Sequence, residues 1–203
     1  MILPLPAGRR YDPAMRSFRD LPPEDGLSPE VGRWYAALEE LRVGTVLLLH
    51  NLNPDQLAWS PGQGLNTIGS LVTHVAEAEA FWLLEQIGGR PLPRERRELY
   101  RMDLFGEPRA PQAPRAPASY FIGLLADLRT ETREVLSGMT DPDLEGKRVW
   151  VPADRPDDRE VFTVRWILNH VLVHEAHHKG QIAILRKILG APPPPVLMER
   201  RQD

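Results

Sequence analysis

Four of the six histidines in this chain lie between His170 and Leu185, in the stretch HVLVHEAHHKGQIAIL. Two of them, His174 and His178, are separated by four positions. On an α-helix, this spacing places two side chains about 40° apart in direction and about 6 Å apart along the axis. Two imidazoles in this arrangement can bind one metal ion, and zinc, nickel, copper and iron all accept imidazole nitrogen. The spacing therefore predicts a metal site carried by a helix.

The third ligand is expected from another helix, and His74 is the best candidate. It lies three residues after Leu71 and four before Ala78, in phase with the apolar residues of its own segment. Three neutral imidazoles that leave further coordination positions to water are typical of a catalytic ion rather than a structural one. A histidine such as His74 can also be a core residue that only makes hydrogen bonds, and this alternative stays open.

The remaining histidines have weaker assignments. His177 is expected beside the metal site or at the surface, and His170 is either a partner that orients a ligand or an exposed residue. His50, near the end of the first expected helix, is interpreted as a favourable contact with the helix dipole.

Two glutamates lie beside the predicted ligands: Glu77 follows His74 by three residues, and Glu175 follows His174 directly. Either can act as a catalytic base, or can orient a ligand by accepting a hydrogen bond from its ring. The simpler alternative for both is a solvated residue on an exposed helix face.

The residues His174 to His178 also match H-E-x-x-H, the helical zinc signature of metallopeptidases. A peptidase of that class needs a third ligand further along the chain, but only 25 residues follow His178 and Glu199 is the sole glutamate among them. A di-iron bundle needs the motif Glu-x-x-His on a second helix. The other expected helices lack that motif, so the sequence favours neither class.

The distribution of proline shows which segments must carry these side chains. Nineteen of the 21 prolines cluster in residues 4–30, 91–117, 142–156 and 192–195, and Pro54 and Pro61 divide the first window. Because proline is excluded from helix interiors, the windows between the clusters are expected to be helices, and their apolar residues recur at helical spacing. The four expected helices run from about Ser28 to Leu52, Asn66 to Ile87, Ser119 to Ser137 and Thr163 to Leu189. Ser28 is a candidate N-cap for the first, with Pro29 in its first turn.

Four amphipathic helices without an alternating strand pattern predict an all-α fold, a four-helix bundle. About 30 residues connect the second and third helices, so this crossover connection is expected to cross the bundle or to cover one end. In the fourth helix, the buried stripe is expected to contain Ile167, Val171, His174, His178, Ile182, Leu185 and Leu189. We expect residues 28–190 to form the bundle, 1–27 a proline-rich N-terminal extension and 191–203 a proline-rich C-terminal tail.

Composition limits the possible partners and compartments. A chain of 203 residues is expected to form one domain. The net charge of −3 gives no general attraction to nucleic acid. The chain has no cysteine, which excludes disulfides and thiolate ligands, and no apolar run of the length that a membrane span needs. A cytoplasmic location is the default expectation.

Two segments together resemble a known family. NTIGSLVTHVAEAEAFW (66–82) and WILNHVLVHEAHHKGQIAIL (166–185) are similar to the DinB-like superfamily of metal-binding four-helix bundles, which includes the YfiT-like proteins. The similarity lies in the histidine of the second helix, in His-x-x-His-His followed by a basic residue, Gly and Gln, and in LNPDQLAWSPGQG (52–64). The resemblance implies that His74, His174 and His178 bind the metal, and that the protein is a homodimer.

The resemblance also implies a choice of activities. Some members of the superfamily are S-transferases that use a low-molecular-weight thiol such as bacillithiol or mycothiol, and others are metal-dependent hydrolases. The expected function is transfer of such a thiol to a small electrophilic substrate, with a divalent ion, zinc or nickel before iron or manganese, as cofactor. Hydrolysis of an amide or ester is the first alternative. A bundle that binds a metal or ligand without catalysis is the second.

Overall fold

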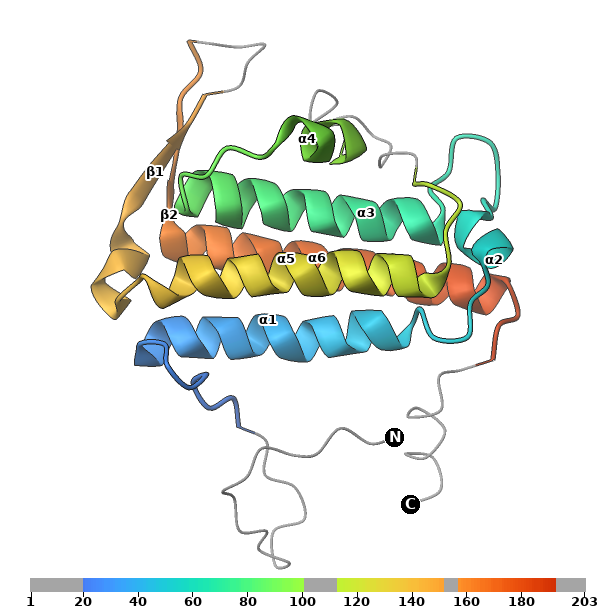
Figure 1. Cartoon of the computed structure of the whole chain (residues 1–203), viewed down its shortest axis with the longest axis horizontal. Coiled ribbons are helices and arrows are strands. Elements are labelled where there is room, and N and C mark those ends of the chain that lie inside the picture. The colour runs from blue at the N-terminus through green and yellow to red at the C-terminus, as the bar shows by residue number, and fades with distance from the viewer. Residues whose placement is uncertain (1–19, 101–112, 152–156, 193–203) are drawn as a thin grey trace, which may run out of the picture.

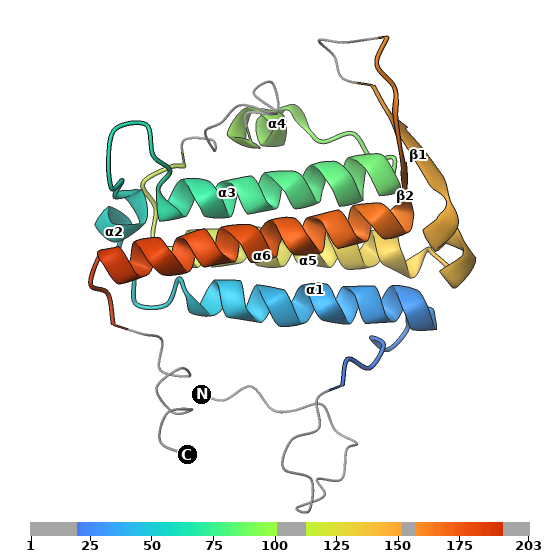
Figure 2. The ribbon, with the colours of Figure 1, turned by 180° about the vertical axis from the view of Figure 1, so that it is seen from behind.

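The computed structural model describes residues 20–100, 113–151 and 157–192. Four long helical segments lie side by side and run the length of the molecule (Figures 1 and 2). They are α1 (Pro29–Leu47), α3 (Ile68–Glu79) continued by the π-helix η1 (Ala80–Ile87), α5 (Ala118–Ser137) and α6 (Val164–Ile188). Helix α6 packs against α3 and α1, and α5 packs against α3, η1 and α1. The predicted all-α four-helix bundle is confirmed.

The helices are separated as the prolines predicted, although the first one is shorter. It ends at Leu47, and a separate short helix, α2 (Pro54–Ala58), follows it. Within the long connection after η1, helix α4 (Arg94–Tyr100) packs on α3 (Figure 1). This cover helps to explain why α3 is buried on almost every side.

Local hydrogen bonds fix where the two site-bearing helices begin. Thr67 accepts a hydrogen bond from the backbone N–H of Ser70, and the Ser70 hydroxyl accepts one from the N–H of Thr67, which completes a capping box for α3. Thr163 accepts a hydrogen bond from the N–H of Trp166 and so caps α6. Both helices therefore start at a position set by their own sequence.

The start of α1 differs from the expectation, because Ser28 does not cap it through its side chain. The Ser28 hydroxyl instead donates to Oδ1 of Asp141, which lies 113 residues further along the chain. The same oxygen accepts the backbone N–H groups of Glu30 and Val31. A distant aspartate thus replaces the local cap, and a sequence pattern restricted to neighbours cannot reveal it.

A β-hairpin lies between α5 and α6, and it was not expected from the sequence. Strands β1 (Lys147–Trp150) and β2 (Glu160–Thr163) pair antiparallel, with Lys147 opposite Thr163. Each strand has only four residues, which is too short for an alternating pattern to be distinguished from a loop. The hairpin stands at one end of the bundle (Figure 1).

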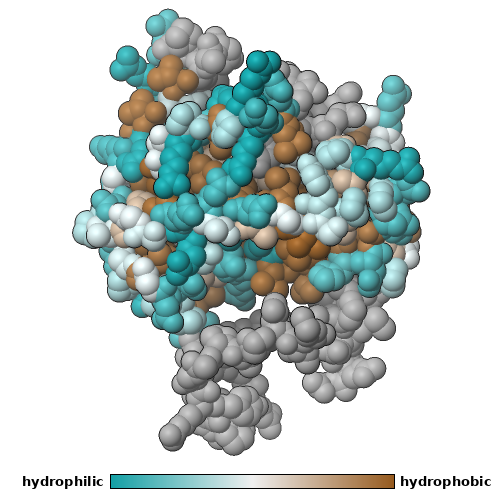
Figure 3. Space-filling view, viewed as in Figure 1, coloured by the Kyte–Doolittle hydropathy of each residue, from teal (hydrophilic) through white to brown (hydrophobic). Residues whose placement is uncertain are grey.

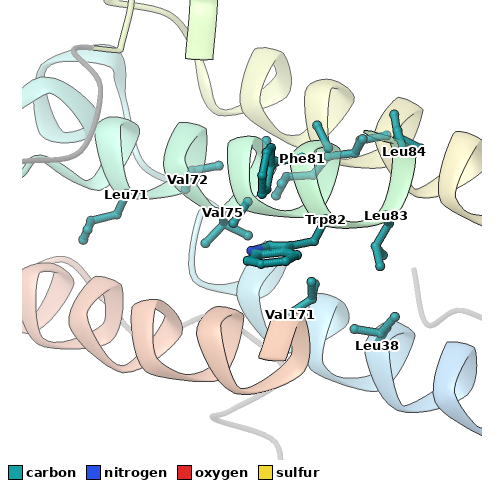
Figure 4. Close-up of a cluster of buried hydrophobic side chains, with 14 of the residues drawn as sticks. Leu38, Leu71, Val72, Val75, Phe81, Trp82, Leu83, Leu84 and Val171 are labelled. Atoms are coloured by element: carbon teal, nitrogen blue, oxygen red, sulfur yellow. The ribbon is translucent and has the colours of Figure 1, made fainter. Parts of the chain in front are cut away.

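The apolar core fills the space between the four helices. Figure 4 shows Trp82 of η1 between the ribbons of α3 and α6, close to Val75 and Val171. The apolar residues that recur at helical spacing in the second and third expected helices are all buried: Ile68, Leu71, Val75, Ala78 and Trp82, and Phe121, Leu125, Leu128 and Val135. Teal and brown residues are interspersed over the face seen in Figure 3. Among the described residues, no helix combines the length and apolar character needed to cross a membrane.

Four charged side chains, one from each long helical segment, meet inside this core. We call Arg42 of α1, Glu79 of α3, Arg129 of α5 and Glu175 of α6 the buried ionic cluster. Arg42 donates to Glu175 Oε1 from Nε at 2.9 Å and to Glu79 Oε2 from Nη2 at 2.5 Å. Arg129 lies 3.0 Å from Glu79 and 3.6 Å from Glu175.

The charged forms of Arg42 and Glu79 are stabilised by their partners in the cluster. Burial would lower the pKa of Arg42, but Glu79 and Glu175 outweigh burial and raise it. Burial would raise the pKa of Glu79, but Arg129, Arg42 and a hydrogen bond from Thr132 lower it below the ordinary value. The cluster thus links all four long helices through charge-assisted hydrogen bonds and ion pairs.

Candidate metal centre

The rings of His74, His174 and His178 converge on one point between α3 and α6. The Nε2 atom of His174 lies 3.2 Å from Nε2 of His74 and 3.2 Å from Nε2 of His178. One ligand atom from each ring lies within 4.8 Å of the other two. The structure therefore brings together the three histidines that the sequence singled out.

The local environments of the two helices explain why these rings are accessible from solvent. Between Ile68 and Leu84, a stretch that is described throughout, His74 is the only residue that is not buried. His174 is also partly exposed, whereas His178 is just buried. The three rings thus lie at the edge of the contact between the helices, where both a metal ion and a substrate can reach them.

Two polar side chains hold the rings in a defined orientation. Nδ1 of His74 lies 2.7 Å from Oε2 of Glu77, and Nδ1 of His178 lies 2.7 Å from Oε1 of Gln181. A carboxylate or amide oxygen can only accept, so Nδ1 carries the proton in both rings. Their Nε2 atoms then carry lone pairs, and both lone pairs face the same point.

The surroundings also keep two of the rings neutral. Burial, together with the neighbouring histidines, lowers the pKa of His174 from 6.5 to about 3. Burial lowers the pKa of His178 to about 4, against the opposing effect of its hydrogen bond with Gln181. A metal ligand must be an unprotonated nitrogen. At neutral pH, these rings need not lose a proton before they bind a cation.

The donor set and its spacing fit a divalent metal ion. Zinc–nitrogen bonds of about 2.0–2.1 Å in tetrahedral geometry place neighbouring nitrogens about 3.4 Å apart. The two Nε2 separations of 3.2 Å are close to that value. Hydrogen bonding alone is a poor explanation, because the three Nε2 atoms include two lone pairs and at most one proton between them. The residues present therefore fit such an ion, with positions left for exogenous ligands.

The two glutamates that were expected either at the site or on a solvated face lie in different surroundings. They are Glu77 and Glu175. Both are buried, so the alternative of a solvated face is wrong for each. Glu77 contacts His74, as an orienting residue should. Glu175 accepts hydrogen bonds from Arg42 in the buried ionic cluster, and this is where its carboxylate is held instead of beside the histidines.

The position of Glu175 also corrects the predicted stripe of α6. The buried face includes Leu168, Glu175 and Arg186, while His174 lies at its margin. The sequence pattern counted a glutamate as exposed, but a glutamate can be buried when an arginine pairs with it.

The remaining histidines occupy distinct places. His170 stacks on Trp166, with ring centroids 4.9 Å apart, and lies 5.9 Å from the ring of His174. His177 is exposed, and its Nε2 lies 3.0 Å from Nε2 of Gln181, the residue that also contacts His178. The side chain of His50 is exposed, and its backbone carbonyl accepts a hydrogen bond from Arg186.

Gln181 is part of the motif that carries the family resemblance, but the sequence assigned it no role at the site. Its spacing of three residues from His178 is the same as that of Glu77 from His74. That repeated spacing was the available signal, because side chains three residues apart on a helix are neighbours.

The chain matches one family model and resembles two solved structures. A family model described as mycothiol-S-transferase matches residues 34–191. A solved DinB-like protein from Bacillus cereus has a TM-score of 0.59 and 19% identity, over 80% of this chain and 94% of that one. YfiT from Bacillus subtilis, described as a probable metal-dependent hydrolase with an unusual four-helix bundle topology, has a TM-score of 0.54 and 20% identity, over 90% of this chain and 95% of that one.

Comparison with curated proteins gives no match. The two solved structures support the fold, and the resemblance to DinB-like and YfiT-like proteins is confirmed. The family model covers most of the chain, including every residue of the three-histidine cluster. The chain therefore belongs to the mycothiol-S-transferase family.

Proposed function

We propose that this protein is a divalent-metal-dependent transferase that joins a low-molecular-weight thiol to a small electrophile. The observation that carries the proposal is the convergence of three imidazole Nε2 atoms, two of them with lone pairs fixed by Glu77 and Gln181. The family match supports a thiol as the cosubstrate. The chain has no cysteine, so the reacting sulfur must come from that cosubstrate.

The residues of the chain divide the work as follows. His74, His174 and His178 would hold the ion, which would supply a Lewis acid that lowers the pKa of a thiol. Glu77 and Gln181 keep the protons of His74 and His178 on Nδ1. The Nε2 atoms of these rings therefore keep a free lone pair with which to bind the ion. In the transfer, the S–H bond breaks and an S–C bond forms. The proton passes to solvent, and the leaving group departs with its bonding electron pair.

Hydrolysis of an amide or ester is the second candidate. The same three histidines would hold the ion, and water would replace the thiol as the nucleophile. The description of YfiT as a probable metal-dependent hydrolase favours keeping this alternative. A bundle that only binds metal or ligand is the third possibility, and metal binding without turnover in either assay would support it.

We further propose zinc or nickel as the ion, ahead of iron or manganese, because a nitrogen ligand set generally binds divalent zinc and nickel more tightly than divalent iron or manganese. A homodimer and a cytoplasmic location stay predictions, drawn from the family resemblance and from composition.

The test combines metal binding with two assays on untagged protein. Replacing His74 with alanine should weaken Zn²⁺ binding at least a hundredfold and abolish thiol transfer, while the helical circular dichroism is kept. His50→Ala is the matched control, because that side chain is exposed. A thiol-consumption assay with mycothiol and an ester-hydrolysis assay, run on one preparation, separate the two activities. Unchanged Zn²⁺ affinity in His74→Ala would refute the proposed centre.

A further inference from the structure

A row of stacked aromatic rings leads from the hairpin to the three histidines. Phe162 of β2 stacks on Trp166 of α6, with centroids 4.4 Å apart and planes at 23°. Trp166 stacks on His170 at 4.9 Å and 12°. His170 in turn lies 5.9 Å from the ring of His174. We call Phe162, Trp166 and His170 the aromatic strip, and it ends directly beside the candidate metal centre.

The strip is held rigidly from its inner side. The buried ring of Trp82 makes edge contacts with all three members, at centroid distances of 5.2 Å to Phe162, 5.8 Å to Trp166 and 5.2 Å to His170. Trp150 of β1 packs 6.4 Å from Trp82 and so secures the hairpin against the bundle. Because these contacts fix the ring positions, little conformational entropy is lost when a ligand binds.

The outer side of the strip exposes large apolar side chains. Trp166 is 42% exposed, and Val173, two turns further along α6, is 57% exposed. From Trp166 to His178, a stretch described without a gap, Glu175 is the only aspartate, glutamate, lysine or arginine, and it is buried. An exposed apolar surface of this kind, next to a candidate active centre, indicates a binding site for an apolar group.

We infer that the aromatic strip binds the electrophilic substrate, and that this substrate carries a flat, apolar, preferably aromatic group next to its reactive carbon. The inference rests on the proposed function, to which it adds the substrate class. A second copy of the chain is the other conceivable occupant. It is disfavoured because a protein surface packed on the strip would also cover the ring of His174 and obstruct access to the metal centre.

The experiment compares two electrophiles with the same leaving group, benzyl chloride and allyl chloride, in thiol transfer by the zinc-loaded protein. Trp166→Leu keeps apolar volume but removes the flat ring. It should lower kcat/KM for benzyl chloride roughly three- to tenfold and change that for allyl chloride less than twofold. Trp166→Phe should restore most of the loss. Tyr120→Leu, which removes an exposed aromatic ring from α5, is the control and should change neither value.

A second measurement does not depend on turnover. Benzyl alcohol, which does not react with thiols, should bind to the wild-type protein and bind several-fold more weakly to Trp166→Leu, as followed by NMR line broadening. If this holds while no thiol transfer is found with any electrophile, the proposed function fails and the strip is still a ligand site. Equal losses for both chlorides with unchanged zinc content would overturn the inference. So would unchanged benzyl alcohol binding, or a dimer that Trp166→Leu converts to monomer.

Discussion

The imidazoles of the candidate centre depend on the residues that face their Nδ1 atoms. Glu77 lies one turn after His74 on α3, and its buried carboxylate has the ring of His74 as a hydrogen-bond partner. A carboxylate in that position fixes the tautomer and makes the opposite nitrogen more basic. Gln181 has the same relation to His178 but carries no charge. Glu77 is therefore expected to contribute more to metal affinity than Gln181.

Replacing Glu77 with glutamine should weaken Zn²⁺ binding about 10–100-fold, because the amide no longer polarises the His74 ring. Competition with a chromophoric chelator measures the affinity. Glu134→Gln provides the matched control, since that carboxylate lies on the exposed side of α5. A Glu77→Gln protein that binds zinc as tightly as the wild type would show that Glu77 does not act through the ring.

The same rings make the metal-free protein sensitive to acid. Burial lowers the pKa of His174 from 6.5 to about 3. Between these two pH values, the ring is protonated in the unfolded chain and neutral in the folded protein. The free energy of unfolding should therefore decrease as the pH falls below 6.5, and continue to decrease towards pH 3. Urea denaturation at pH 7 and pH 5, with a chelator present, measures this slope. His174→Gln should reduce this slope but not abolish it, because the pKa of His178 is also lowered, to about 4. An identical slope in that variant would contradict the assignment.

Phase along the helices was enough to predict which rings meet, because His74, His174 and His178 each lie on or beside the buried stripe of their own helix. The burial of Glu175 could not be predicted in this way. Its environment depends on Arg42, which is 133 positions away, and a single-sequence pattern treats a lone glutamate as solvated. Metal binding itself stays a prediction.

At the scale of elements, close packing at helix ends limits which side chains are tolerated. A Cβ atom added at Gly88, where η1 ends, would lie 2.7 Å from the carbonyl oxygen of Leu84 and 2.9 Å from Cγ2 of Val135 on α5. A Cβ atom at Gly123, inside α5, would meet nothing within 4 Å. The first glycine is thus required by packing. The second only destabilises the folded state, because glycine gives the unfolded chain extra conformational entropy that is lost on folding.

Gly88→Ala should destabilise the protein by about 1–3 kcal/mol, because the backbone carbonyl cannot move aside easily. Gly123→Ala should stabilise it by roughly 0.5–1 kcal/mol through improved helix propensity. Chemical denaturation of both variants, monitored by circular dichroism, checks the opposite signs. Equal effects in the two variants would mean that the contact between η1 and α5 is looser than described.

The long helices were predictable from proline-free windows, because a segment of about 20 residues with apolar residues at helical spacing is too long for a single strand and fits an amphipathic helix. The hairpin and α2 were not, because four or five residues contain too little of any period. The π-helical hydrogen bonding of η1 was also not predictable. The apolar pattern of that segment shows which residues are buried. It does not show whether each N–H bonds to the carbonyl four residues earlier, as in an α-helix, or five residues earlier, as in a π-helix.

For the molecule as a whole, the buried ionic cluster is the feature with the largest expected effect on stability. Arg42→Met should lower the free energy of unfolding by about 3–5 kcal/mol, because it leaves two buried carboxylates with Arg129 alone. Arg133→Met removes an arginine of α5 whose side chain is 42% exposed. This change should lower the free energy of unfolding by less than about 1 kcal/mol. Urea unfolding curves provide both values. A similar small loss in both variants would show that the cluster is dispensable.

The cluster also has a consequence for how the chain reaches its native state. Arg42, Glu79, Arg129 and Glu175 each come from a different helix, so any two helices that docked alone would carry at least one charge into an apolar contact without its full set of partners. Partial assemblies are thereby penalised, and only the assembly of all four helices gives every charge its full set of partners. The same contacts that fix the native arrangement thus favour all-or-none assembly over stepwise docking.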